Sequence, residues 1–168
     1  MNDIMESIRE AGGRIRADER IRSNILQLEQ NINTFKRENG IPDPECPLTH
    51  TFASGSYART IFIPKDTLVV GKIHRHDHLN MLMAGRVVVA TEEGPRKLEA
   101  PQVLVSKAGT KRVVYTYTDT IWTTVHLTEK TDLEEIEDEI IAKDYSEFDS
   151  IEDSNVRQVV LAIESEVA

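Results

Sequence analysis

The chain has 168 residues, a net charge of −9 at pH 7 and 39% hydrophobic residues. That length is enough for one medium domain with a buried core and extensions. The negative charge, without any Lys/Arg cluster, excludes general nucleic-acid binding. No apolar run approaches a membrane span, and the N-terminus lacks the apolar core of a signal peptide. The single cysteine, Cys46, excludes an internal disulfide framework, so we expect a soluble cytoplasmic protein.

Residues 1–40 predict a helical arm. Gly12 and Gly13 are expected to interrupt it, because paired glycines are poor helix formers. Between Ala17 and Glu38 the apolar residues alternate spacings of four and three, which is an a/d seam. Such a narrow stripe serves either to cover the domain that follows or to join two chains, and the pattern favours neither. The seam residues are Ile21, Ile25, Leu28, Ile32 and Phe35.

Three prolines within residues 41–47 indicate an extended linker, and residues 48–128 then read as β structure throughout. Many short strands separated by regular turn signals indicate an antiparallel sandwich or barrel and not a parallel sheet. The expected strands are Thr49–Ala53, Ala58–Ile63, Thr67–His74, Leu79–Ala84, Arg86–Thr91, Arg96–Ala100, Gln102–Ser106, Arg112–Thr118 and Ile121–Leu127.

Residues 129–168 form an acidic C-terminal region, in which residues 129–153 alone carry twelve acidic and two basic side chains. A helix is expected from Asp132 to Ala142, capped by Thr131 or Asp132. A weaker helix is expected from Val156 to Val167. The acidic run lacks the spacing of a calcium loop, so we interpret it as a solvated helical face.

Three of the five histidines lie within five residues, between Gly71 and Gly85. Alternate residues of a strand share one face, so His74 and His76 would point the same way. His78 lies past the corner and could converge with His74 from the neighbouring strand. Neutral imidazole is the commonest protein ligand for transition metals. The histidine corner therefore predicts a metal site.

This corner, with Gly71 before it and Gly85 after it, resembles the first motif of the cupin superfamily. Residues 107–112 are similar to the Pro-x-Gly-x-x-His stretch of the second motif. The run from about Thr49 to Lys143 is similar to short cupin-like proteins of bacteriophage and prophage genomes. The resemblance implies a mainly β fold, an antiparallel double-stranded β-helix of the cupin jelly-roll type. The helical arm before it and the acidic helices after it are expected from the sequence pattern alone.

The motif departs from the usual cupin pattern of two histidines and a glutamate. Counting back from Gly85 places Lys72 at the first histidine, His74 at the second and His78 at the glutamate. Counting forward from the histidine pair uses His74 and His76 instead, and Asn80 then replaces the glutamate. We prefer His74 with His78, completed by His126 or His76, as ligands for a divalent metal such as Fe, Mn, Ni or Zn.

Arg112 stands where the second motif usually supplies its last histidine. A fixed guanidinium charge suits a carboxylate or phosphate, so Arg112 should enter the barrel and be answered by Glu99, Asp119 or an anionic ligand. Other candidates for the ligand pocket are Tyr57, Arg59, Asn80 and Tyr115.

Two functions follow from these features. The first is a non-catalytic, phage-type binding or assembly module, homo-oligomeric and most simply dimeric, with a pocket for an anionic small molecule. It would work in the host cytoplasm or as part of a virion with other phage proteins. The alternative is a metal-dependent enzyme, namely a dioxygenase, isomerase or hydrolase.

Overall fold

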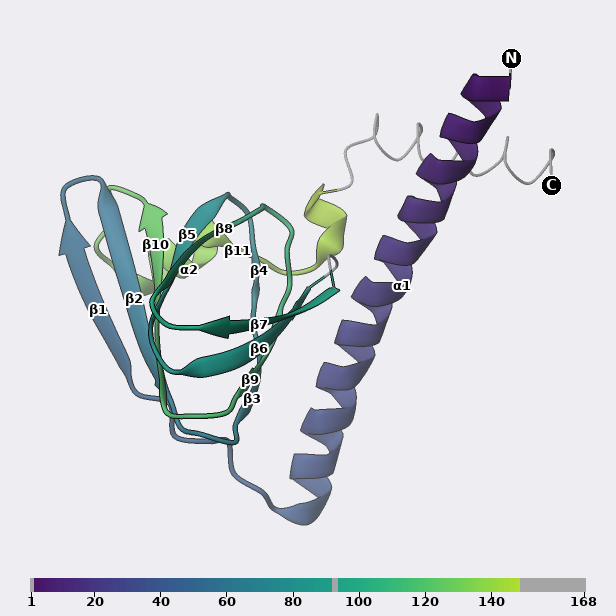
Figure 1. The fold of residues 1–168 in the computed structure, drawn as a ribbon. Helices are drawn as coiled ribbons and strands as arrows, with labels where there is room; N and C mark the ends of the chain where they lie inside the picture. The colour runs from purple at the N-terminus through teal and green to yellow at the C-terminus, as the bar shows by residue number, and fades with distance from the viewer. Residues whose placement is uncertain (1, 92–93, 149–168) are drawn as a thin grey trace.

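The computed structural model describes residues 2–91 and 94–148, in which two large antiparallel sheets and a long N-terminal helix are the main elements (Figure 1). One sheet has five strands in the order β1-β2-β10-β5-β8, and the other has four in the order β3-β9-β6-β7. This is the two-sheet arrangement of jelly rolls, the architecture to which cupins belong. The strands are β1 Leu48–Ala53, β2 Ser56–Ile63, β3 Leu68–Val70, β4 Ile73–His74, β5 His78–Ala84, β6 Arg86–Thr91, β7 Gly94–Glu99, β8 Gln102–Ser106, β9 Val113–Thr116, β10 Thr120–Leu127 and β11 Ile141–Ala142.

The main core lies between the two sheets. Alternation along β5 and β10 sends every second side chain inward. Leu82 is fully buried there, and it packs with Trp122 of β10 and Val87 of β6. The antiparallel strands that the alternating pattern predicts are thus present, and they form a jelly roll.

The prediction of one continuous strand over Thr67–His74 is wrong, because the chain forms two short strands there instead. β3 pairs with β9, whereas β4 pairs with β11, which lies far ahead in the sequence. Between them the backbone N–H of Gly71 donates to the carbonyl of Arg112 at 2.8 Å. His74 therefore belongs to a separate two-stranded ladder at one end of the sandwich.

The C-terminal helix is shorter than predicted. Helix α2 spans Leu133–Ile140 and is capped by the Asp132 carboxylate, which accepts from two backbone N–H groups. Ile141 and Ala142 do not continue it, since they pair with β4 as strand β11. A short 3₁₀ turn, η1, follows at Tyr145–Phe148. The helix expected at 156–167 lies outside the described residues.

Helix α1 runs from Asn2 to Asn39 without interruption, so the predicted break at Gly12 and Gly13 is wrong. A penalty of about 1 kcal/mol for each glycine is not enough to break so long a helix. Part of the seam packs on the same chain: Ile25 is 6% exposed, and Lys111 Nζ lies 3.0 Å from Glu29 Oε2. Phe35 remains 60% exposed. No helix in the described residues is long and apolar enough to cross a membrane.

Candidate metal centre

Three histidines from three strands converge at one end of the sandwich. His74 ends β4, His78 begins β5, and His126 lies near the end of β10. β5 and β10 are antiparallel neighbours with Leu79 opposite Val125, so His78 and His126 come to the same edge. The ring centroids lie 4.2 Å apart for His74 and His78, 5.0 Å for His74 and His126, and 4.9 Å for His78 and His126. We call these three residues the histidine triad.

The triad is buried and held in its neutral form. Burial, followed by the proximity of His78 and His126, lowers the pKa of His74 to about 2. Burial and then His78 lower the pKa of His126 to about 4. Burial also lowers the pKa of His78, even though its Nδ1 hydrogen-bonds to the carbonyl of His76 at 3.0 Å. Neutral imidazole is the form that binds metals.

Two nitrogen atoms of the triad are buried without a hydrogen-bond partner: His74 Nδ1 and His78 Nε2. A buried polar atom without a partner costs about 1–3 kcal/mol, so native proteins rarely leave one unused. One potential ligand atom from each triad residue lies within 4.8 Å of the others. Nitrogens on a single ion at about 2.1 Å lie at most about 4.2 Å apart, so modest ring rotation brings them to one metal. The triad therefore fits a divalent transition metal.

The remaining corner histidine does not join this group. His76 is exposed, and its backbone carbonyl, not its ring, contacts His78. Asp77, next along the chain, turns outward and accepts from Lys107 Nζ at 2.6 Å and from the backbone N–H of Ala108. The structure thus brings together His74, His78 and His126, and it leaves His76 outside the group.

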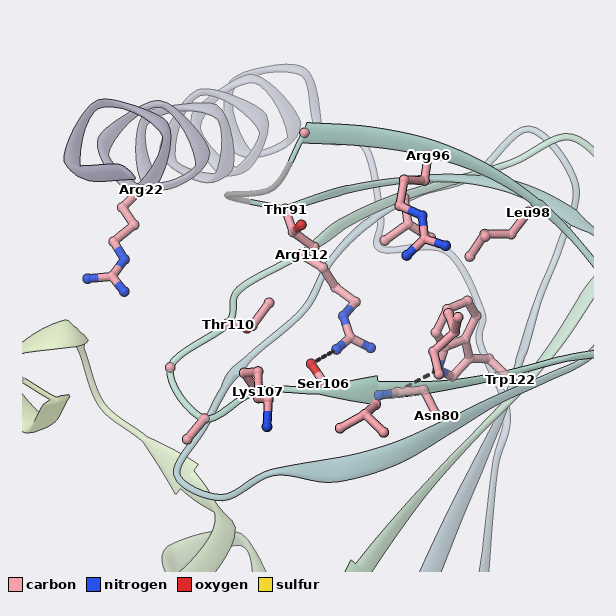
Figure 2. A pocket seen from close by; sticks show the side chains of 16 residues that line it. Arg22, Asn80, Thr91, Arg96, Leu98, Ser106, Lys107, Thr110, Arg112 and Trp122 are labelled. Atoms are coloured by element: carbon pink, nitrogen blue, oxygen red, sulfur yellow. Dashed lines mark hydrogen bonds between the residues drawn. The ribbon is translucent and has the colours of Figure 1, made fainter. Parts of the chain in front are cut away.

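Arg112 points into a cavity of the barrel, as expected (Figure 2). One of its terminal nitrogens donates to Ser106 Oγ, and its guanidinium carbon lies 5.8 Å from the centre of the Trp122 ring. Asp119, one of the carboxylates expected to answer it, instead accepts from the backbone N–H of Lys65. Glu99, the other, is exposed on β7.

A cavity of about 440 Å³ surrounds Arg112 and reaches Asn80. Asn80 is 1% exposed, and its Oδ1 accepts from Trp122 Nε1 at 2.9 Å (Figure 2). Its Nδ2 has no partner within the described residues. None of the triad histidines lines this cavity. Arg112 and Asn80 therefore belong to a cavity that the triad histidines do not line.

A second cavity, of about 270 Å³, is lined directly by His74 and His126. Tyr57 and Arg59 of β2 form part of its wall, and helix α2 closes it with Ile136 and Ile140 among others. We call it the α2 cavity. Tyr57 lies 6.4 Å from His126, ring centre to ring centre. Burial raises the pKa of Tyr57, so its hydroxyl stays protonated.

Four of the five predicted ligand residues thus line these two cavities, and Tyr115 lines neither of them. Tyr115 lies on β9 of the other sheet, where its hydroxyl donates to Asp66 Oδ1 at 3.2 Å. The rings of Tyr115 and Tyr117 meet edge to face, with their centres 5.2 Å apart.

Sequence reasoning missed two groups that shape the site. His50 is not among the candidates named from the sequence, but its Nδ1 lies 2.7 Å from the hydroxyl of Tyr57. Register across the β1–β2 hairpin is the signal that could have found this pair, since Tyr57 lies opposite Phe52 and His50 is two residues along the same face. The second group is β11, which orders the strand of His74 and which no local pattern distinguishes from helix.

No protein-family model matches the sequence, and no curated protein matches it. Solved structures that resemble the fold include a cupin-2 domain protein from Shewanella frigidimarina, with 10% identity, a TM-score of 0.43, and coverage of 56% of this chain and 92% of that one. KdgF from Halomonas sp. has 15% identity, a TM-score of 0.45, and coverage of 54% and 85%. An acetylacetone dioxygenase from Acinetobacter johnsonii has 16% identity, a TM-score of 0.43, and coverage of 51% and 61%. Likeness at this level does not assign a function, which has to follow from the histidines and cavities of this chain.

Proposed function

We propose that the chain is a cupin that holds a divalent transition metal on His74, His78 and His126 and binds a small anionic molecule beside it. The observation that carries this proposal is the buried triad with two nitrogens that lack partners. Three neutral ligands leave coordination positions open. When bound, the metal would supply Lewis acidity to a group placed in those positions.

The charge of the site favours an anion. A dication on three neutral imidazoles keeps its full charge, and Arg59 and Arg112 both lie near enough to help lower the pKa of His74. The side chain of Arg59 makes neither an ion pair nor a hydrogen bond with another described residue. A half-buried cation beside a metal is stabilised by a negative partner.

The α2 cavity is the better place for this anion, because two triad histidines line it directly. Arg59 would bind a carboxylate or phosphate, and the protonated Tyr57, hydrogen-bonded to His50, would donate to it or orient it. At about 270 Å³ the cavity lies near the lower end of ligand pockets, so the ligand has few heavy atoms.

A second candidate function is catalysis at the same centre, as a dioxygenase, isomerase or hydrolase. The open coordination positions favour it, since a site with three protein ligands resembles catalytic metal sites more than closed structural ones. In that case Tyr57 would hold or transfer a proton at its hydroxyl, and Arg59 would orient the substrate. The non-catalytic module remains the first candidate because the glutamate and the last histidine of the cupin motifs are absent.

The phage assembly role is a hypothesis that rests on the sequence resemblance of residues 49–143. The solved structures named above are described as bacterial proteins, so they add nothing to it. A cytoplasmic or virion location and phage partners belong to the same hypothesis.

Metal analysis of untagged protein tests the centre. Chelated wild type is loaded separately with Fe²⁺, Mn²⁺, Ni²⁺ and Zn²⁺, and bound metal is counted by mass spectrometry. We expect close to one equivalent for at least one metal, and at least tenfold weaker binding for His78→Ala and His126→Ala. His76→Ala is the matched control, since this histidine is exposed and lies outside the triad. The proposal is contradicted if His76→Ala weakens metal binding as much as the triad variants do, or if the wild type takes up none of the four metals.

Oxalate and inorganic phosphate are suitable probes for the anion, with thermal stabilisation of the metal-loaded protein as the readout. Arg59→Gln should abolish the stabilisation by the probe and leave metal content unchanged. Arg112→Gln is the comparison, because Arg112 lines the other cavity, of about 440 Å³. If only Arg112→Gln loses the stabilisation by the probe, the anion binds in the cavity of about 440 Å³ and not in the α2 cavity.

A further inference from the structure

The outer face of the five-stranded sheet carries no charged side chain. Side chains alternate along each strand, so every second residue points away from the core. Two complete rows cross all five strands. One row is Val105, Leu79, Val125, Ala58 and Thr51, and the next is Val103, Met81, Thr123, Thr60 and Thr49. We call the surface formed by these rows and their flanking residues Met83, Ile121, Phe62 and Leu127 the sheet A face.

The sheet A face is largely apolar, with threonines as its polar residues, and it is most exposed toward β8 and the strand ends. Val103 is 65% exposed, Val105 63%, Met83 54% and Leu127 84%. Soluble proteins rarely leave such a contiguous apolar surface in water unless it binds something. Charged residues make up 29% of the chain, yet none of them lies on this face.

No described helix lies over this face. Helix α1 runs along the side of the four-stranded sheet, and β1 and β2 lie at the far side of the molecule from it (Figure 1). Helix α2 packs on Tyr57, which belongs to the inner face of β2. The sheet A face therefore has no partner among the described elements.

The size of the face matches a standard protein interface. Five strands spaced about 4.8 Å apart span about 20–24 Å, and the eight residues of β10 extend about 26 Å. The flat area is thus roughly 500–600 Å², and side-chain relief makes the accessible area larger. A stable interface needs about 800 Å² from each partner, which the face comes close to providing.

We propose that the occupant is a second copy of this chain, which packs face to face through the sheet A face across a two-fold axis. Each copy carries a charge of −9, much of it in residues 129–153, so two copies can approach only through a surface free of that charge. An uncharged apolar face is complementary to itself, as a two-fold interface requires. Antiparallel sheets pack in this way at about 30° between their strands.

This interface differs from the α1 seam, on which the sequence alone based its dimer. Ile25 of that seam is already buried within its own chain, which leaves Leu28 and Phe35 as its exposed apolar residues. The two interfaces can be separated by single charges. Val105→Lys places like charges in the sheet A face, and Phe35→Lys places them in the seam.

Sedimentation velocity of the full chain between 1 and 100 µM tests the proposal. We expect wild type at twice the chain mass of 19.0 kDa, and Val105→Lys with a dissociation constant raised at least 100-fold. Tyr117→Lys is the matched control, since Tyr117 is 46% exposed on the other sheet, and it should stay dimeric. Circular dichroism should show that all three variants keep the wild-type fold, because each residue is exposed in a single chain.

Two results overturn the proposal. The first is a wild type that stays monomeric at 100 µM, which includes the case in which residues 149–168 cover the face. The second is a dimer that Phe35→Lys dissociates and Val105→Lys does not, which assigns the contact to the α1 seam.

Discussion

Acidification of the metal-free protein gives the sharpest test of the buried triad. Each triad histidine has a lowered pKa in the folded protein, to about 2 for His74 and about 4 for His126. The unfolded chain, with histidine pKa values near 6.5, therefore binds more protons below that pH. The stability contributed by the neutral triad is complete above about pH 6.5 and is lost as the pH falls toward the folded values.

The magnitude follows from the proton uptake of the unfolded state. At pH 5.5, one unit below the unfolded pKa, each histidine favours unfolding by about 1.4 kcal/mol. His74 and His126 together give about 3 kcal/mol, and His78, whose pKa is also lowered, adds to this. Solvent screening reduces the sum, so we expect a loss of roughly 2–4 kcal/mol between pH 7.5 and 5.5. The acids with lowered pKa, Asp77 and Glu147, contribute only at lower pH.

Urea unfolding of the chelated protein at several pH values measures this loss. His126→Gln should remove about a third of the pH dependence, whereas His76→Gln, at an exposed position, should keep all of it. A saturating metal that binds the triad should raise the free energy of unfolding at pH 7.5 and leave the His126→Gln variant much less affected. A wild type equally stable at both pH values would refute the idea of a triad buried in its neutral form.

The other predictions concern groups that hold the site in place, and urea unfolding measures each of them. Ile136→Ala opens a hole where α2 closes the α2 cavity and should cost about 2–4 kcal/mol; a loss below about 0.5 kcal/mol would show that α2 does not pack there. Trp122→Phe removes the indole donor to Asn80 Oδ1 and should cost about 1–3 kcal/mol, and an unchanged midpoint would contradict that hydrogen bond. Gly85→Ala places a Cβ 2.5 Å from Thr120 Oγ1 at a φ of +100°, so it should destabilise by more than about 1 kcal/mol, which a neutral result would disprove.

The sequence determined the class of fold and two of the three triad residues. Short alternating apolar runs with regular turn residues favour antiparallel strands whatever lies across from them, so residues 48–128 could be assigned as β. His74 and His78 are only four residues apart around a corner, and so short a segment has few ways to separate them. These inferences depend on local spacing, which a sequence displays directly.

Only the tertiary structure decided the rest, because it depends on pairings between distant segments. His126 was named by elimination, and it joins the triad through the register of β10 on β5, some forty residues away. Helical periodicity predicted that Ile141 lies in a helix. In the structure Ile141 instead pairs with His74, 67 residues earlier, and this strand pairing holds His74 in place. The sheet A face also needed the strand order, since its two rows come from five separate segments. Backbone hydrogen bonds between remote strands, which leave no local mark in the sequence, brought these residues together.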